Sequence, residues 1–224
     1  MKNLWKMWGN LKRFMLAGAA AFSLLIPGYA SGAQPQEELD DMTFIEMINS
    51  VELGNQSSFI QKFQEKEARS KLMPKFDSQE ARKAGFRVEN FRNKEVILVT
   101  IPASHLFAPN STELSPKASE YLSPFKRYLK NPDTYRVLLV MHTDNTGSDT
   151  YRDEITEKRV DAVFDWFDAQ GDDTSFLFPY AMGDEMPLLK NDSQENRNRN
   201  RRLEIYLMPG EKMIEMARKG TIDF

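Results

Sequence analysis

The chain has 224 residues, of which 41% are hydrophobic and 28% charged, an ordinary balance for a globular protein of one or two domains. It contains no cysteine, so disulfides, thiol catalysis, cysteine-ligated metal centres and cysteine-linked lipids are excluded. The formal net charge is −3, so no overall positive charge favours nucleic acid as a partner.

The first 33 residues have the pattern of a secretory signal peptide. Four basic residues, the last of them Arg13, precede an uncharged run from Phe14 to Ala33, and small residues follow Pro27. A basic region, an apolar region and a small-residue exit are typical of a cleaved export signal. Because the uncharged run of 20 residues is also just long enough to span a bilayer, an uncleaved membrane anchor is the alternative. Removal of residues 1–33 leaves an acidic chain, with 26 Lys and Arg against 33 Asp and Glu.

A linker and a short helical segment are expected next. Residues 34–42 are polar and acidic, which predicts a linker, and residues 43–77 carry two short helical patterns. The capping-box pattern occurs twice, in Thr43 with Glu46 and in Ser58 with Gln61. Pro74 is expected to end the second helix. We expect these helices to stand apart from the domain that follows.

Residues 78–208 alternate between strand and helix patterns and form the main predicted domain. Strands are expected at 86–91, 95–101, 137–141, 176–181 and 203–208, and helices at 115–129, with a kink at Pro124, and 150–169. This order predicts an α/β two-layer sandwich with the helices on one face of a small sheet. Residues 209–224 are a tail with a short helix at 212–219.

One charged residue interrupts the apolar stripe of the helix expected at 150–169. Arg159 lies four residues after Ile155 and three before Ala162, so it faces the same side, and Arg152 lies on the same line. An inward-facing charge needs a partner, because an unpaired buried charge is costly. Arg159 therefore either pairs with a carboxylate of this chain or binds a ligand carboxylate through its two-donor fork.

The loop at 142–147 follows a continuous apolar strand, at the carboxyl end where α/β sheets build ligand sites. Asp144 can accept hydrogen bonds from an ammonium group or shape the loop as an Asx-turn, whereas Asn145 and Gly147 are expected to be turn residues. One carboxylate and one guanidinium around a pocket suit a zwitterion. Because the chain has only two histidines, His142 with Asp144 is not expected to bind a metal.

These motifs resemble the OmpA-like peptidoglycan-binding domain. The resemblance rests on the loop at 142–147, Arg159 fifteen residues after Asp144, and the Arg-x-x-Asn-Arg-Arg-Leu-Glu run at 197–204, in the family's order over roughly residues 86–208. It implies a βαβαββ sandwich that grips meso-diaminopimelate of the peptidoglycan stem peptide, without cofactor or covalent chemistry. It also implies that Asp144 meets the amino group, and Arg159 the carboxylate, of one zwitterionic end.

Other residues of the matched motifs have two readings. Arg152 stands where the family commonly has Asn, and Ala108 stands where it often has an acidic residue. Arg152 is either a second carboxylate contact or a solvated surface charge, and Thr143 can offer contacts beside Asp144. Three arginines either line the pocket or anchor the loop at 183–200, namely Arg197, Arg201 and Arg202. For Arg202, anchoring of the loop is favoured. Asn200 is expected to close that loop by hydrogen bonds.

The resemblance implies a periplasmic protein, associated with the outer membrane and the cell wall, that tethers the envelope to peptidoglycan. The alternative is an inner-membrane-anchored, stator-like or envelope-complex subunit whose domain is a wall anchor. Residues 14–33 contain no acidic residue, so proton-driven work is not expected. An enzyme is not expected, because the chain lacks a Cys nucleophile and a Gly-x-Ser-x-Gly elbow. The mixed charges of residues 65–69 favour a solvated helix face, while contacts of residues 43–73 with other envelope proteins and a homodimer are left open.

Overall fold

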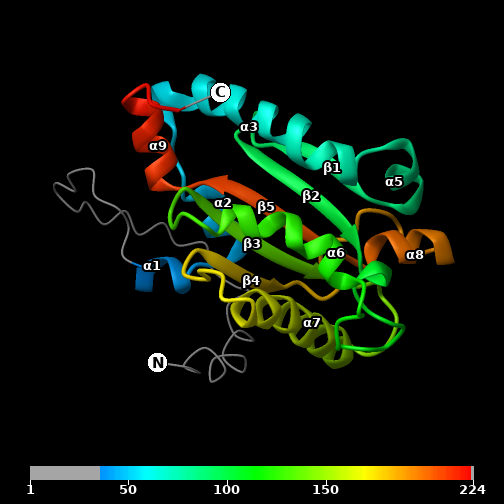
Figure 1. Ribbon diagram of the computed structural model, residues 1–224. Helices are drawn as coiled ribbons and strands as arrows, with labels where there is room; N and C mark the ends of the chain where they lie inside the picture. Colours follow the sequence, from blue (N-terminus) through cyan, green and yellow to red (C-terminus); the bar gives the residue numbers. More distant parts are fainter. Residues whose placement is uncertain (1–35, 223–224) are drawn as a thin grey trace. The chain divides into compact units, whose positions relative to one another are not determined.

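The computed structural model describes residues 36–222, so the segment predicted as a signal peptide lies outside the described residues. Residues from Gln34 onward form one compact unit (Figure 1). Its helices, with 3-10 and π-helical turns labelled η, are α1 (Gln36–Asp40), α2 (Phe44–Asn49), η3 (Gly54–Gln56), α3 (Ser57–Glu67), η4 (Ala68–Leu72), α4 (Met73–Phe76), α5 (Gln79–Ala84), η5 (Ala103–His105), α6 (Ala118–Leu122), η6 (Ser123–Tyr128), α7 (Asp149–Ala169), α8 (Gln194–Asn200) and α9 (Glu211–Arg218). Its strands are β1 (Arg87–Phe91), β2 (Val96–Pro102), β3 (Tyr135–His142), β4 (Leu177–Ala181) and β5 (Arg202–Pro209).

The five strands form one sheet in the order β1-β2-β5-β3-β4. Only the β3–β4 pair is parallel among these strands, and α7 makes the crossover between them. From β2 onward the chain runs strand, helix, strand, helix, strand, strand, with the short α8 before the last strand. The predicted α/β sandwich is therefore confirmed, with β1 added as an edge strand.

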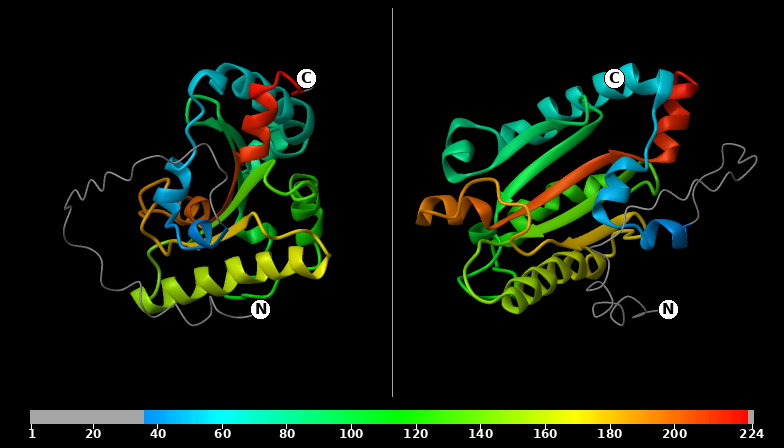
Figure 2. Two further views of the ribbon diagram at one scale, coloured as in Figure 1. Left: turned by 90° about the vertical axis from the view of Figure 1, so that its left-hand side faces the viewer. Right: turned by 180° about the vertical axis from the view of Figure 1, so that it is seen from behind.

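The central strands are buried on both faces. Val99, Ile205 and Leu139 lie side by side across β2, β5 and β3, and all eight residues of β3 and of β5 are buried. Such continuous burial needs cover on both sides of the sheet. The expectation of helices on one face only is wrong, because α6 and η6 lie on one face whereas α2 lies on the other (Figure 2).

The second face is covered through aromatic contacts of α2. The ring of Phe44 lies 5.3 Å from that of Tyr206 and 5.7 Å from that of Tyr180, measured between centroids. The Tyr180 hydroxyl donates a hydrogen bond to the carbonyl of Met42 at 3.2 Å. The segment before the sheet thus completes the burial of β4 and β5.

The rest of this segment packs against β2, β5 and η6. Gln64 of α3 is fully buried, and its Nε2 donates to the carbonyls of Glu95 at 2.9 Å and Leu207 at 3.1 Å. The ring of Phe76 in α4 lies 5.5 Å from the ring of Phe125. Residues 43–77 therefore share the core of the sheet and do not stand apart from it.

Local sequence signals in this segment have mixed outcomes. The capping box of Thr43 with Glu46 is confirmed, because each side chain bonds the other residue's backbone N–H. The second box is wrong: α3 begins at Ser57, whose hydroxyl donates to Glu95 at 2.6 Å. Pro74 does not end the helix, because it occupies the first turn of α4, where a missing N–H costs no hydrogen bond. The expected linker includes α1.

None of the helices within residues 36–222 has the length and apolar character that crossing a membrane requires.

Candidate ligand-binding site

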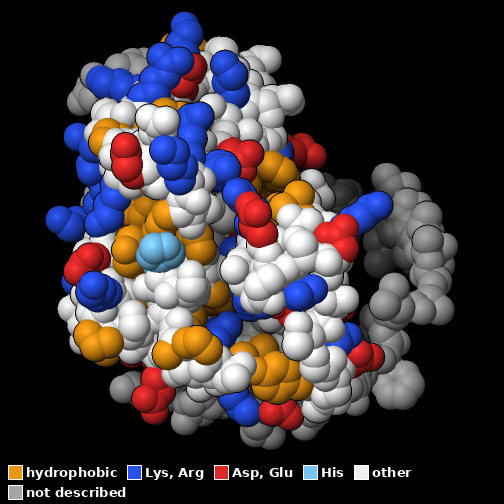
Figure 3. All heavy atoms as spheres, turned by 90° about the vertical axis from the view of Figure 1, so that its right-hand side faces the viewer, with side chains coloured by type: hydrophobic (Ala, Val, Ile, Leu, Met, Phe, Trp, Pro, Cys, Tyr) orange, Lys and Arg blue, Asp and Glu red, His pale blue; other side chains and the backbone are white. Residues whose placement is uncertain are grey.

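A cavity of about 1220 Å³ opens where β3 ends, between the loop after β2, α7 and α8. Figure 3 shows this hollowed face, with a histidine over apolar side chains and many lysine and arginine side chains around it. Five residues that the sequence singled out line the cavity, namely Thr143, Asp144, Arg159, Arg201 and Arg202. The structure does not place Arg152, Arg197, Asn145, Gly147 or Asn200 in its lining.

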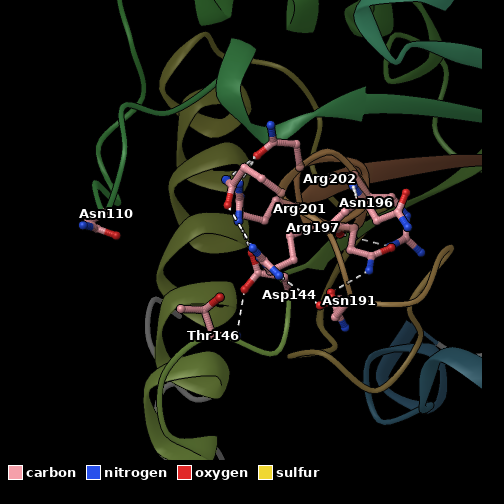
Figure 4. Close-up of polar contacts among 12 residues, drawn as sticks. Asn110, Asp144, Thr146, Asn191, Asn196, Arg197, Arg201 and Arg202 are labelled. Carbon is pink, nitrogen blue, oxygen red and sulfur yellow. Dashed lines mark hydrogen bonds and ion pairs between the residues drawn. The ribbon is translucent and has the colours of Figure 1, made fainter.

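Asp144 is held in the cavity wall by two donors. Its side chain is 2% exposed; Oδ1 accepts a hydrogen bond from the backbone N–H of Thr146 at 2.7 Å, and Oδ2 forms an ion pair with Arg201 (Figure 4). The backbone N–H of Thr143 donates to the carbonyl of Gly183 at 2.8 Å, which ties this loop to the end of β4. Asp144 therefore shapes an Asx-turn, and its side chain also lines the cavity.

Arg159 is 5% exposed and lacks an acidic partner within residues 36–222. Its Nε donates to the carbonyl of Ser111 at 2.9 Å, and its guanidinium carbon lies 4.9 Å from the centroid of the Phe107 ring. Burial lowers the pKa of Arg159, which the nearby Tyr151 only partly offsets. Among the described residues, the reading of Arg159 as one half of an internal ion pair is therefore wrong.

The residues at the start of α7 fix where the helix begins, and one face of the helix lines the cavity. Ser148 caps the helix by accepting a hydrogen bond from the N–H of Tyr151 at 3.2 Å. Gly147 has a φ of 89°, and a Cβ there would lie 2.7 Å from the Tyr151 ring. Tyr151, Ile155 and Arg159 then line the cavity at intervals of four residues, which places them along one side of the helix.

Arg152 connects the loop that follows β3 to the loop that follows β4 through hydrogen bonds. Its Nε donates to Asp184 at 2.7 Å, its Nη1 donates to the Gly147 carbonyl at 2.6 Å, and its Nη2 pairs with Asp149. Each of its three donor nitrogens therefore has a partner in the described structure. The contacts fix the start of α7 against the loop that follows β4.

The loop at 183–200 is held from inside by three predicted residues. Arg197 donates to the carbonyl of Asn191 at 3.0 Å, and Asn200 Nδ2 donates to the Leu189 carbonyl at 2.7 Å (Figure 4). Arg202 donates to the carbonyl of Met186 at 3.0 Å. Asn145, by contrast, is exposed at the loop tip.

A buried ionic cluster lies behind Arg202. Glu204 accepts hydrogen bonds from Arg202 at 2.7 Å and Tyr206 at 2.7 Å, and its Oε2 lies 3.2 Å from Nε2 of His142. Burial alone would raise the pKa of Glu204, but the His142 hydrogen bond and the Arg202 charge outweigh it and lower this pKa to about 2. Burial lowers the pKa of His142. The His142 side chain therefore contacts Glu204 inside the sheet and does not line the cavity.

Sequence reasoning missed the far wall of the cavity, which contains Lys83, His105, Lys117 and Tyr121. Nδ1 of His105 lies 3.2 Å from the Tyr121 hydroxyl. Tyr121 falls within the helix expected at residues 115–129, and no local pattern distinguishes the other three residues. Their common position arises from the packing of α5 and α6 around η5.

Residues 106–201 match the OmpA family. This match agrees with the resemblance that the motifs of the chain carry. It is 28% identical over 125 residues to the probable lipoprotein YiaD of Escherichia coli, which covers 56% of this chain and 57% of that protein. It is 30% identical over 101 residues to the peptidoglycan-binding protein ArfA of Mycobacterium bovis, covering 45% of this chain and 31% of that protein.

A solved structure shares the fold over more of the chain. A putative MotB-like protein from Desulfovibrio vulgaris superimposes with a TM-score of 0.58 at 24% identity, covering 68% of this chain and 95% of that one. The curated relatives are matched over less than two thirds of their own length.

Proposed function

We propose that this protein binds peptidoglycan non-covalently through the diaminopimelate of the stem peptide, and so tethers the cell envelope to the wall. One observation carries the proposal: Arg159 is a buried guanidinium in a cavity wall, without an acidic partner in the described chain, and Asp144 lines the same cavity. A charge left unpaired by the fold is costly unless a ligand completes it.

The chemistry of the two groups suits one zwitterionic end. The Arg159 fork matches the planar geometry of a carboxylate, and a charge-assisted pair in a partly desolvated site is stronger than one in water. Asp144 accepts hydrogen bonds from the ligand ammonium, and its pairing with Arg201 orients the carboxylate. Thr143 lies beside it in the wall. Recognition requires no covalent step.

The relatives support this function and its location. One is named a peptidoglycan-binding protein, and another is named an outer-membrane lipoprotein, YfiB of Pseudomonas aeruginosa. A protein that contacts the wall must reach the periplasm, which agrees with the export signal expected at residues 1–33. We therefore place the proposed activity in the periplasm, at the cell wall.

The test is co-sedimentation of the protein with purified sacculi, together with calorimetric titration with meso-diaminopimelate. Asp144→Ala and Arg159→Ala should each weaken binding by roughly tenfold to a hundredfold, since charge-assisted hydrogen bonds contribute about 1.5–3 kcal/mol. Arg159→Lys should also bind poorly, because an ammonium group lacks the planar two-donor fork.

Lys158→Ala is the matched control. Lys158 neighbours Arg159 on α7 but is exposed and pairs with Glu154 at 3.0 Å, so its loss should leave binding unchanged. Circular dichroism and thermal melting establish that each variant is folded. Wild-type binding by a folded Arg159→Ala protein would contradict the proposal.

A further inference from the structure

The cavity holds more positive charge than one zwitterion can neutralise. Six cationic side chains line it, against two carboxylates, those of Asp144 and Glu195. The six are Lys83, Lys117, Arg159, Arg199, Arg201 and Arg202. His105 adds no charge near neutral pH, because burial lowers its pKa. A ligand that suits this cavity is therefore an anion with more than one negative group.

Three of the six cations already have acidic partners. Arg201 pairs with Asp144, Arg202 with Glu204 at 2.7 Å, and Arg199 with Glu195 at 3.4 Å. Within residues 36–222, Lys83, Lys117 and Arg159 form no ion pair with an acidic residue. Arg159 accounts for one ligand carboxylate under the proposed function. Two lysines remain for which that function gives no role.

The residues next to both lysines pack at the cavity, whereas the lysine side chains themselves are exposed. Lys83 lies in the last turn of α5. Gly85, two residues later, packs against Pro102 so closely that a Cβ on Gly85 would lie 3.0 Å from the proline ring. The ring of Phe86 then lies 4.6 Å from His105 and stacks on Tyr121 at 5.3 Å.

Lys117 immediately precedes α6, the helix that contains Tyr121. The aromatic group of Phe86, His105 and Tyr121 thus joins the two elements that carry the lysines. α5 lies outside residues 106–201, so Lys83 lines the cavity from a part of the chain that the family match does not cover, whereas Lys117 lies within the matched residues.

We propose that Lys83 and Lys117 form a second carboxylate-binding site in this cavity, which holds a carboxylate of the wall peptide other than the one bound by Arg159. The inference rests on the proposed function and extends it from a single residue to a longer stretch of peptide. One carboxylate of the stem peptide has this chemistry and is absent from free meso-diaminopimelate, namely the α-carboxylate of the γ-linked glutamate. Long flexible lysine side chains reach it as point charges.

The experiment compares three probes by calorimetry at low salt: meso-diaminopimelate, the tripeptide L-alanyl-γ-D-glutamyl-meso-diaminopimelate, and the same tripeptide with its glutamate α-carboxylate amidated. The double variant Lys83→Gln/Lys117→Gln should weaken tripeptide binding about threefold to tenfold, as expected for two solvent-exposed charge pairs. Its binding of meso-diaminopimelate should be unchanged. The loss should shrink as salt is added.

The amidated probe tests whether the glutamate carboxylate is the group bound. If it is, amidation weakens wild-type binding, and the double variant no longer discriminates the two tripeptides. Equal weakening of both tripeptides by the variant would contradict the inference, because the glutamate carboxylate would then have no part in it. Lys71→Gln is the control, since Lys71 is exposed on η4 and outside the cavity lining.

Unchanged tripeptide binding by the double variant would overturn the inference, and so would an equal loss for meso-diaminopimelate, which indicates a diffuse electrostatic effect. Failure of the wild-type protein to bind any of the probes is a different result, because it refutes the proposed function itself.

Discussion

The carboxylate of Asp144 is held by the guanidinium of Arg201, which lies 57 positions further along the chain. The Asp144 side chain is buried and the Arg201 side chain is 30% exposed, so the pair is only partly desolvated. The pair joins the loop after β3 to the residue before β5, and it orients a carboxylate in the cavity wall.

Removal of Arg201 should therefore affect folding as well as binding. Arg201→Ala leaves Asp144 buried without its counter-ion, and we expect a loss of about 1–3 kcal/mol in the free energy of unfolding. Adding Asp144→Asn should recover part of that loss, because the orphaned charge is gone. Urea denaturation of the four proteins of this double-mutant cycle measures the coupling, and additive effects would contradict the ion pair.

Arg152 should be dispensable for ligand binding. Its three donor nitrogens are satisfied by Gly147, Asp149 and Asp184, and it does not line the cavity. We expect Arg152→Ala to change the affinity for meso-diaminopimelate less than about twofold while lowering the melting temperature by a few degrees. A tenfold loss of affinity in a protein of unchanged melting temperature would instead assign Arg152 to the ligand.

Truncation before Ser78 should unfold the domain. The deletion uncovers Tyr180 and Tyr206, which pack against Phe44, and removes Gln64 and Phe76 from the core. We expect a fragment of residues 78–224 to be insoluble or to lack a cooperative melting transition. In the full chain, Phe44→Ala should cost about 3–4 kcal/mol of stability and leave the site intact. A soluble, cooperatively folded fragment would show that the amino-terminal helices are dispensable.

Stability should fall on acidification in two stages. Burial lowers the pKa of His142 below its ordinary value of 6.5, so below pH 6.5 the unfolded chain binds more protons than the folded chain, and stability decreases with falling pH. The Glu204 pKa of about 2, against an ordinary 4.5, has the same sign and acts between those two values.

Melting temperatures measured from pH 7 to pH 3 test this expectation. His142→Asn should flatten the first stage, and His105→Asn should account for the remainder, because burial also lowers the pKa of His105. A wild-type melting temperature that rises from pH 6.5 to pH 5 would contradict the assignment.

Much of the fold could be predicted from the sequence because its signals are local. Alternating or continuous apolar patterns placed β1 to β5 within two residues of their observed ends, and the Thr43–Glu46 box located the start of α2. Local spacing also brought Arg159 to the inward face of α7 and Asp144 to the end of β3. Each of these features depends on residues only a few positions apart, whose relative directions follow from helical or strand geometry.

The tertiary structure decided which charges have partners and which surfaces are covered. Arg152 and Asp184 are 32 positions apart, and no periodicity relates them, so only the packed chain shows that Arg152 has an acidic partner while Arg159 has none among residues 36–222. The cover of the second sheet face by Phe44 and the approach of Lys83 to the cavity are likewise long-range. Ion pairing and burial depend on distances in space, and the sequence pattern of an amphipathic helix is the same whichever surface it covers.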